Sequence, residues 1–312
     1  MNIVLLFPGQ GSQSPGMAHD LVQAHDAARD VFLRGDEALG FALSDLAFSG
    51  PDTELTLTRN AQPALLLHGA AVLAVLAPAL GGRVVAAAGH SLGEFTAYHA
   101  AGSLTLEAGA RLVRRRGELM QETGETRPGA MAAILGNVEG GIEAVCERAS
   151  AEADVVVPAN YNSAVQVVVS GSVAGVERAM ELAREAGAKR TVRLNVSGAF
   201  HSPLMEPAAR GLEAALEAAG IADAAFPVWS NVSAQPVQLA ADARRLLHQQ
   251  LTSPVRWTDI MEGLAAAHPD ALFLEMGPGN VLTGLMKRAA PGVRIQPCGT
   301  AAEVDAIASE LA

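Results

Sequence analysis

The chain is poor in aromatic residues, in cysteine and in basic side chains, and each shortage excludes a class of protein. Aromatics at 4% beside 31 Gly favour strands that alternate with helices of small residues, hence an α/β protein. Cys146 and Cys298 lack metal-ligand spacing, so we expect two buried, reduced thiols and no metal site. Lys and Arg number 22 against 33 Asp and Glu, and the net charge of −11 argues against nucleic acid or an anionic membrane as a partner.

The sequence also lacks a hydrophobic run long enough to span a bilayer. The longest run, Ala64–Leu80, is rich in alanine, carries His68 and Pro78, and is shorter than the ~20 residues that a spanning helix needs. Asn2–Phe7 is apolar but short, and no basic residue precedes it as one would in a signal peptide. We therefore expect a buried helix, a buried strand and a cytoplasmic protein that does not contact the membrane.

A serine between two glycines marks the most informative stretch of the chain. Arg83–Gly89 predicts a strand, Gly89-His90-Ser91-Leu92-Gly93 a sharp turn, and Glu94–Ala101 a helix. Such a strand, turn and helix expose the serine hydroxyl, and the N–H groups at the start of the helix face a developing negative charge. Ser91 is therefore a candidate nucleophile of a hydrolase or a transferase.

The strand predicted over Asn2–Phe7 ends in a second glycine-rich loop, Pro8-Gly9-Gln10-Gly11-Ser12-Gln13. A loop after a buried strand places backbone amides at the edge where open α/β sheets bind ligands. Gly9 and Gly11 have no third glycine at the required spacing, so the loop is not a dinucleotide-binding fingerprint.

The middle of the chain has a different rhythm, which predicts a small subdomain inserted into a larger one. Strands and helices alternate in the order β-α-β-β-α-β of the ferredoxin-like motif. The predicted elements are Met131–Leu135, Val138–Ala149, Asp154–Ala159, Val165–Ser170, Val173–Ala186 and Lys189–Val196. We therefore expect a ferredoxin-like subdomain over 127–197 and a large α/β subdomain over 1–126 and 198–312, with further strands at Pro227–Ser230, Ala271–Glu275 and Arg294–Pro297.

One arginine lies on the wrong face of its helix. Thr105–Glu122 predicts an amphipathic helix, and Arg116 falls near the middle of its apolar arc. A buried guanidinium needs an anionic partner or dense hydrogen bonding. That partner is either a buried Asp or Glu of the chain or a carboxylate of the substrate.

A serine nucleophile needs a base, and eight histidines compete for this role. His90 directly precedes Ser91, so its side chain should point away from the hydroxyl. His68, on the apolar helix, is most simply a hydrogen-bonded core residue. His201 follows a Gly-Ala-Phe loop between a strand and a Ser-Pro helix start, which is a rigid position suited to a base, although an ordinary loop histidine explains it equally well.

Five motifs are spread along the chain, from the first predicted strand to the last predicted helices. They are Phe7-Pro8-Gly9-Gln10-Gly11-Ser12-Gln13, Gly89-His90-Ser91-Leu92-Gly93-Glu94, Arg116-Gly117-Glu118-Leu119-Met120, Gly198-Ala199-Phe200-His201-Ser202-Pro203-Leu204-Met205 and Gly277-Pro278-Gly279-Asn280-Val281-Leu282. Together they resemble the malonyl-CoA:acyl-carrier-protein transacylase family over essentially the whole chain. The resemblance implies an α/β-hydrolase-like large subdomain with an inserted ferredoxin-like small one.

The resemblance also implies a role for each matching residue. Ser91 would be the nucleophile and His201 its base and acid, Gln10 and Leu92 would supply the oxyanion-hole amides, Arg116 would hold the malonyl carboxylate, and Gln250 would orient the histidine. Candidates for the substrate pocket are Phe200, Met120, Asn160 and Asn162. In polyketide relatives a Phe before the histidine accompanies malonyl, so Phe200 favours malonyl over methylmalonyl.

The implied reaction moves malonyl from malonyl-CoA to a phosphopantetheinylated acyl carrier protein in fatty-acid synthesis. It needs no permanently bound cofactor, and we expect a monomer. Three alternatives remain: a free-standing acyltransferase of a polyketide synthase, a serine esterase or thioesterase, and a silent carrier-docking subunit. An esterase usually has the chain order Ser, Asp or Glu, then His, and many lipases carry a His-Gly-Gly-Gly loop that is absent here.

Overall fold

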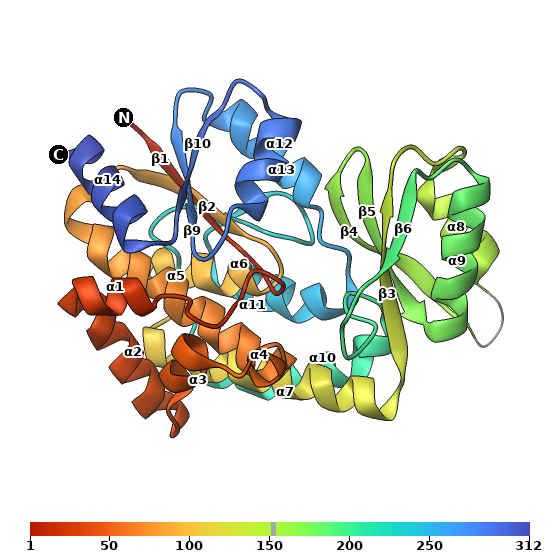
Figure 1. The fold of residues 1–312 in the computed structure, drawn as a ribbon, viewed down its shortest axis with the longest axis horizontal. Helices are drawn as coiled ribbons and strands as arrows, with labels where there is room; N and C mark the ends of the chain where they lie inside the picture. Colours follow the sequence, from red (N-terminus) through yellow and green to blue (C-terminus); the bar gives the residue numbers. More distant parts are fainter. Residues whose placement is uncertain (151–153) are drawn as a thin grey trace.

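The computed structural model describes residues 1–150 and 154–312, and its strands form two separate sheets (Figure 1). The larger sheet has the order β10-β9-β1-β2-β7-β8. Its strands are β1 (Ile3–Phe7), β2 (Val84–Gly89), β7 (Val228–Trp229), β8 (Pro236–Val237), β9 (Leu272–Met276) and β10 (Arg294–Cys298). All neighbours are parallel except β7 and β8, which pair antiparallel. The prediction of an α/β protein is confirmed.

The central strand β1 is uniformly apolar because both of its faces are buried, as is usual for parallel strands covered by helices. Ile3, Leu5 and Phe7 enter one hydrophobic cluster, whereas Val4 and Leu6 enter another on the opposite face. The second face is covered by α12 (Trp257–Ala267) and α13 (Val281–Ala289). The helices that contribute to the first cluster are α1 (His19–Ala24), α2 (Asp26–Leu39), α3 (Leu43–Ser49), α4 (Asp52–Leu55), α5 (Thr58–Leu80), α6 (Leu92–Ala100), α7 (Leu106–Thr126), α10 (Glu206–Ala218), α11 (Ala240–Gln249) and α14 (Ala301–Leu311).

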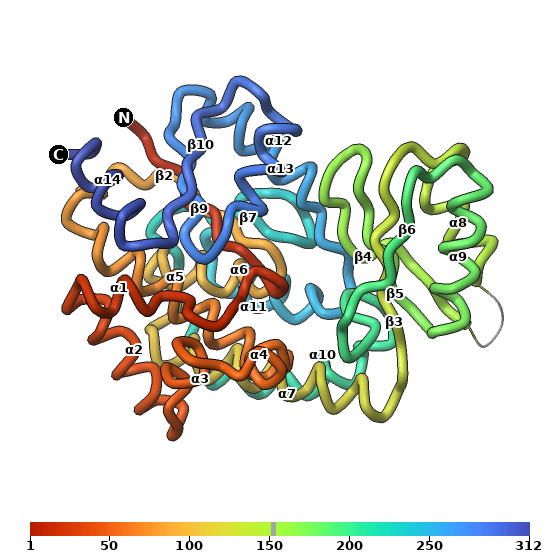
Figure 2. The backbone as a smooth tube through the Cα atoms, in the orientation of Figure 1, coloured from red at the N-terminus to blue at the C-terminus, as the bar shows by residue number. Residues whose placement is uncertain are grey.

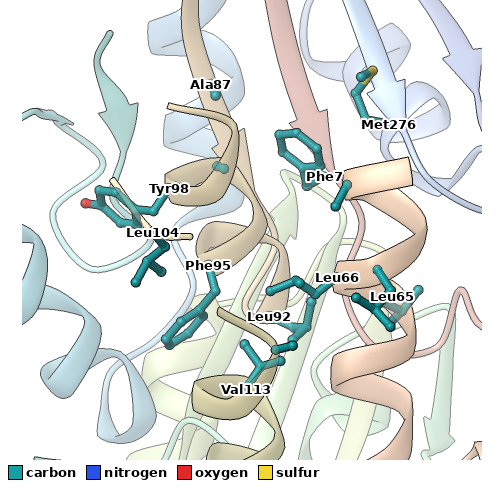
Figure 3. Packing of buried hydrophobic residues seen from close by; sticks show 14 of the residues in the cluster. Phe7, Leu65, Leu66, Ala87, Leu92, Phe95, Tyr98, Leu104, Val113 and Met276 are labelled. Atoms are coloured by element: carbon teal, nitrogen blue, oxygen red, sulfur yellow. The ribbon is translucent and has the colours of Figure 1, made fainter. Parts of the chain in front are cut away.

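Helix α5 contains the longest apolar run and lies in the core of the protein. The prediction that this run is too short to span a bilayer is wrong, because the helix extends over 23 residues and is long and apolar enough to cross a membrane by length and composition. However, 67% of its most apolar window is buried inside the protein. Leu66 of α5 meets Leu92 of α6 and Val113 of α7 in the first cluster (Figure 3). The prediction of a buried helix is confirmed, and so is that of a core histidine, because His68 Nε2 lies 2.7 Å from the Gly299 carbonyl oxygen. Cys146 and Cys298 are buried free thiols, as predicted.

The smaller sheet has the order β4-β5-β3-β6, and its neighbouring strands are antiparallel. Along the chain its elements are β3 (Gly129–Leu135), α8 (Gly141–Ala149), β4 (Val156–Ser163), β5 (Gln166–Ser172), α9 (Val173–Glu185) and β6 (Arg190–Arg193). α8 and α9 cover the face away from the larger sheet (Figure 1). Met131 and Ala133 lie on the opposite face of the smaller sheet and belong to the first hydrophobic cluster. The chain crosses between the two parts once after α7 and again after β6, as Figure 2 shows.

Several predicted boundaries differ from the structure, and two of them have a local reason. The strand predicted over Lys189–Val196 ends at Arg193, because the next three residues turn towards the cavity described below. The helix predicted from Val138 starts only at Gly141, because Gly140 and Gly141 have left-handed φ values of 80° and 87° that interrupt a helix at this point. The two-residue strand β8 was not predicted, and two short 3₁₀ helices, η1 (Pro203–Met205) and η2 (Gln250–Thr252), flank α10 and α11.

Candidate active site

Ser91 occupies the turn between β2 and α6 in a strained backbone conformation, with φ of 51° and ψ of −103°. The flanking glycines are needed because the backbone is crowded on both sides of the turn. A Cβ on Gly89 would lie 1.9 Å from the Gly93 carbonyl carbon, and a Cβ on Gly93 would lie 2.1 Å from the Phe7 carbonyl oxygen. The turn is therefore packed directly onto the end of β1, and the serine is held at the carboxyl edge of the sheet.

His201 faces this serine from the loop after the smaller sheet. Its Nε2 lies 2.8 Å from Ser91 Oγ, and its Nδ1 lies 2.8 Å from the backbone carbonyl oxygen of Gln250. A carbonyl only accepts, so Nδ1 carries the proton and Nε2 is free to accept the serine proton. Burial, and after it the positive charge of the nearby Arg116, lowers the pKa of His201 to about 3. The imidazole is therefore neutral at neutral pH, as a base must be.

Arg116 reaches the same serine from α7 and is only 1% exposed. Its Nη2 donates to Ser91 Oγ at 3.1 Å and to Gln250 Oε1 at 2.8 Å, and its Nη1 donates to Gln62 Oε1 at 2.7 Å. Across residues 1–150 and 154–312, no carboxylate lies within salt-bridge distance of this guanidinium, and its Nε has no hydrogen-bond partner. Burial lowers the pKa of Arg116 to about 9. The geometry therefore shows no direct ion pair with an Asp or Glu of the described residues, and the guanidinium is held by hydrogen bonds to side chains that carry no charge.

The two residues predicted to supply oxyanion-hole amides come from the loops that follow β1 and β2. Leu92 is the first residue of α6, so its N–H has no carbonyl partner within the helix. Gln10 lies in the loop after β1, the strand next to β2, and its side chain donates to Thr58 Oγ1 at 3.2 Å. Both residues line the cavity that contains Ser91.

This cavity has a volume of about 390 Å³ and collects most of the predicted site. The predicted residues among its lining are Gln10, Ser91, Leu92, Arg116, Met120, Asn160, Phe200 and His201. Asn162 is not part of the lining: its Oδ1 lies 2.8 Å from Nε2 of His90. Asn162 therefore fixes His90 away from Ser91 and does not form a wall of the pocket.

The backbone carbonyl of Gln250 accepts a hydrogen bond from His201, while its side chain contacts other residues of the site. The Nε2 of Gln250 donates to the Ser91 carbonyl oxygen at 3.0 Å and to Glu94 Oε2 at 2.7 Å. The residue therefore contacts the histidine, the arginine and the serine turn at once. Its position in a short 3₁₀ helix after α11 makes these three contacts compatible.

Three polar residues that form hydrogen bonds with the site were not predicted from the sequence. Asn231 accepts from the Ser91 N–H at 2.7 Å and donates to the Gly89 carbonyl oxygen at 2.7 Å. It directly follows a predicted strand, so its place at the carboxyl edge of the sheet could have been noticed. Glu94 and Gln62 are wholly buried, one beside the nucleophile motif and one on an apolar helix. Only their polarity in apolar surroundings could have marked them.

The chain is similar to known proteins over most of its length. The acyl transferase domain family matches residues 4–303. The malonyl CoA-acyl carrier protein transacylase of Bacillus subtilis (strain 168) is 47% identical over 286 residues, which cover 92% of this chain and 90% of that protein. The protein of the same name from Escherichia coli (strain K12) is 41% identical over 91% of each chain.

Solved structures match over the whole length. The acyl-carrier-protein-S-malonyltransferase from Bartonella henselae superposes with a TM-score of 0.94 at 41% identity, covering 100% of this chain and 99% of that one. A malonyl-transacylase in complex with its type II PKS acyl-carrier protein matches with a TM-score of 0.94 at 38% identity, covering 99% and 100%. With the serine, histidine and arginine gathered at one cavity, these likenesses show that the chain belongs to the malonyl CoA-acyl carrier protein transacylase family of acyl transferases.

Proposed function

We propose that this protein transfers a malonyl group from malonyl-CoA to the phosphopantetheine thiol of acyl carrier protein in fatty-acid synthesis, through an ester on Ser91. The observation that carries the proposal is that one hydroxyl oxygen lies 2.8 Å from a neutral imidazole and 3.1 Å from a buried guanidinium. In a malonyl ester of Ser91, the free carboxylate would be separated from the ester carbonyl by a single methylene. It could therefore reach Arg116 without leaving the cavity.

In the first half-reaction, Ser91 Oγ attacks the thioester carbonyl while His201 Nε2 accepts the serine proton. The amides of Gln10 and Leu92 would stabilise the oxyanion, a role supported by the position of both residues in the lining of the cavity that contains Ser91. When the tetrahedral intermediate collapses, His201 returns the proton to the sulfur of CoA. The Gln250 carbonyl stabilises the imidazolium in between because it accepts from Nδ1.

The second half-reaction repeats these steps in reverse. The phosphopantetheine thiol gives its proton to His201, attacks the malonyl ester, and leaves as malonyl thioester while Ser91 regains its proton. Each transfer is balanced, since one carbonyl–heteroatom bond forms and one breaks. The steps use this chain and its two substrates only, so we propose no permanently bound cofactor.

Acyl selection follows from the burial of Arg116. An acyl group without a carboxylate would not form the charge-assisted pair with the buried guanidinium that a malonyl carboxylate forms, so it should bind and react less well. Met120 and Phe200 line the same cavity, and their bulk supports a preference for the small malonyl group over branched relatives.

The test is covalent labelling followed by a comparison of acyl groups. Incubation with malonyl-CoA should add one malonyl group to the protein, visible by intact mass, and Ser91→Ala should remove it. Arg116→Ala should reduce malonyl transfer by about 10²-fold or more while sparing or raising acetyl transfer. Equal losses for the two acyl groups would reject the carboxylate clamp, and label that survives Ser91→Ala would reject the nucleophile.

A carrier of polyketide synthesis is the second candidate partner. The observation in its favour is the 38% identical relative solved with its type II PKS acyl-carrier protein. Transfer to a panel of fatty-acid and polyketide carriers distinguishes the two. An esterase is disfavoured because the partner of His201 Nδ1 is a carbonyl and not a carboxylate; rapid hydrolysis of malonyl-CoA without a carrier would reverse that judgement.

We also propose the finer architecture and setting. The β-α-β-β-α-β order and the sheet order β4-β5-β3-β6 support a ferredoxin-like subdomain over 127–197, inserted in an α/β-hydrolase-like subdomain over 1–126 and 198–312. The buried α5 and two free thiols support a cytoplasmic protein. We propose a monomer that binds acyl carrier protein but neither nucleic acid nor membrane, which light scattering of the pure protein tests for the oligomeric state.

A further inference from the structure

A carboxyl group lies directly beneath the serine turn and is unused by the reaction just described. Glu94, on the first turn of α6, is 0% exposed. Its Oε2 accepts two hydrogen bonds, from Gln250 Nε2 at 2.7 Å and from the Asn231 backbone N–H at 3.1 Å. Its Oε1 has no hydrogen-bond partner in the part of the chain that the structure describes. One oxygen of this carboxyl therefore accepts two hydrogen bonds and the other accepts none, although the Ser230 hydroxyl lies near enough to the carboxyl to lower its pKa.

The side-chain amide of Gln250 connects this carboxyl to the arginine of the site. It donates to Glu94 through Nε2 and accepts from Arg116 through Oε1 at 2.8 Å. A carboxylate only accepts and a guanidinium only donates, so the two charges together fix the direction of the amide between them. Each charge also favours the other, because Arg116 lowers the pKa of Glu94 and Glu94 raises that of Arg116. With the acyl site empty, the two charges balance.

An acyl carboxylate would disturb this balance. Once malonyl pairs with Arg116, the site would hold two carboxylates and one cation, and an uncompensated buried anion is strongly unfavourable. A proton on the free Oε1 of Glu94 would remove the excess charge. Both hydrogen bonds to Oε2 would survive, so Gln250 and the serine turn would keep their places.

We propose that Glu94 is the counter-ion of Arg116, relayed by the Gln250 amide, and that it takes up a proton when an acyl carboxylate binds Arg116. Glu94 is thus a positioning residue that sets the charge of the acyl site. The inference rests on the proposed malonyl transfer and adds a proton to its balance: malonyl-enzyme formation consumes one solvent proton, and transfer to the carrier releases it.

The other groups that face Glu94 leave it as the group that titrates. Tyr98 on the same helix has a pKa raised by burial, so its hydroxyl stays protonated. Asn231 and Ser230, after β7, do not ionise, and His201 stays neutral because its pKa is about 3. Burial already raises the pKa of Glu94 to about 7, against the hydrogen bonds that lower it. When a malonyl carboxylate pairs with Arg116, its negative charge offsets the positive charge of the guanidinium and raises the pKa of Glu94 further. Above pH 7 the malonyl-enzyme therefore holds more protons than the free enzyme.

The experiment counts protons as the acyl-enzyme forms. Wild-type protein is mixed with malonyl-CoA in weak buffer with a pH indicator at pH 7.5 to 8, and malonyl-enzyme is counted by intact mass. We expect uptake that approaches one proton per malonyl-enzyme, and a loading constant that falls up to about tenfold per pH unit above pH 7. Acetyl-CoA, which loads an acyl group without a carboxylate and releases the same thiol, should give no uptake per acetyl-enzyme formed.

Two variants complete the design. Glu94→Gln should abolish the uptake and flatten the pH dependence of loading, whereas Glu217→Gln, an exposed site on α10, should behave as wild type. Malonyl-enzyme without uptake, or equal uptake with acetyl-CoA, overturns the role of Glu94 and needs no variant to fold. Equal uptake in Glu94→Gln overturns it as well. If no malonyl-enzyme forms in the wild type, the proposed function itself falls, and this inference with it.

Discussion

Two units, each made of a strand, a turn and a helix, flank β1 in the larger sheet. They differ in what lies at the N-terminus of the helix. On one side β2 leads through Ser91 into α6, and on the other β9 leads through Gly277-Pro278-Gly279-Asn280 into α13. In the second unit, the carboxylate of Glu275 accepts from the N–H groups of Leu282 at 2.9 Å and Thr283 at 2.7 Å. In the first unit, the helix N-terminus faces a cavity instead.

A helix N-terminus can bind a developing negative charge only when no side chain of the protein already occupies it. Glu275 is 0% exposed and provides the negative charge that the α13 terminus favours. The acidic residue of α6, Glu94, lies beneath the turn and is bonded to Gln250 and Asn231. The Leu92 N–H thus stays available for an oxyanion. The two units share an architecture, but one is closed by its own carboxylate.

Ser91→Gly tests the open unit and should have the largest effect. It removes the nucleophile, so malonyl transfer should fall by about 10³-fold or more. It also replaces a residue at φ of 51° by one that tolerates the conformation, so the glycine variant should exceed Ser91→Ala in free energy of unfolding by about 1 kcal/mol. Urea unfolding of the two variants and a transfer assay provide the measurements.

Ser91→Ala is the matched control because it lacks the same hydroxyl and keeps the Cβ. Both variants leave His201 and Arg116 without their serine partner, so that loss cancels in the difference. If the alanine variant were as stable as the glycine variant or more so, the backbone strain at this turn would have no energetic weight.

Glu275→Ala tests the closed unit. Two buried amides of α13 would lose their acceptor, so the free energy of unfolding should fall by about 2–4 kcal/mol. The kcat of the folded protein should stay unchanged, because Glu275 does not line the cavity of Ser91. Glu275→Gln keeps one acceptor and should fall between the alanine variant and the wild type. Lost transfer with unchanged stability would mean that the two units are not separable.

The comparison also shows how far sequence could reach. Strands such as Asn2–Phe7 and the glycines around Ser91 were predictable, because burial on both faces and a crowded turn restrict the residue types directly. The partners of Arg116 were not, since Gln62 and Gln250 lie 54 and 134 positions away along the chain. Only the family resemblance pointed to Gln250, and it could not separate the work of its carbonyl from that of its side chain. Long-range polar networks leave no periodic pattern, so only the fold reveals them.

The two buried histidines provide the last and smallest test. His68 and His201 are 2% and 3% exposed, and burial lowers their pKa values from 6.5 to about 4 and about 3. The folded state therefore binds fewer protons than the unfolded chain, so the stability that each provides is complete above pH 6.5 and is lost as the pH falls towards the folded pKa. Between pH 7 and pH 5 each should account for a loss of about 2 kcal/mol in the free energy of unfolding.

His68→Gln and His201→Gln should each remove a similar share of this pH dependence, measured by urea unfolding at the two pH values. Only His201→Gln should also abolish malonyl transfer, because His68 bonds the Gly299 carbonyl and His201 bonds Ser91. If His68→Gln kept the full wild-type loss between pH 7 and pH 5, burial would not hold this ring neutral. The expected result is a similar loss of pH dependence in the two variants and a loss of malonyl transfer in His201→Gln alone. It would show that burial makes a histidine neutral, and that only a histidine within hydrogen-bond distance of the serine oxygen acts as the base.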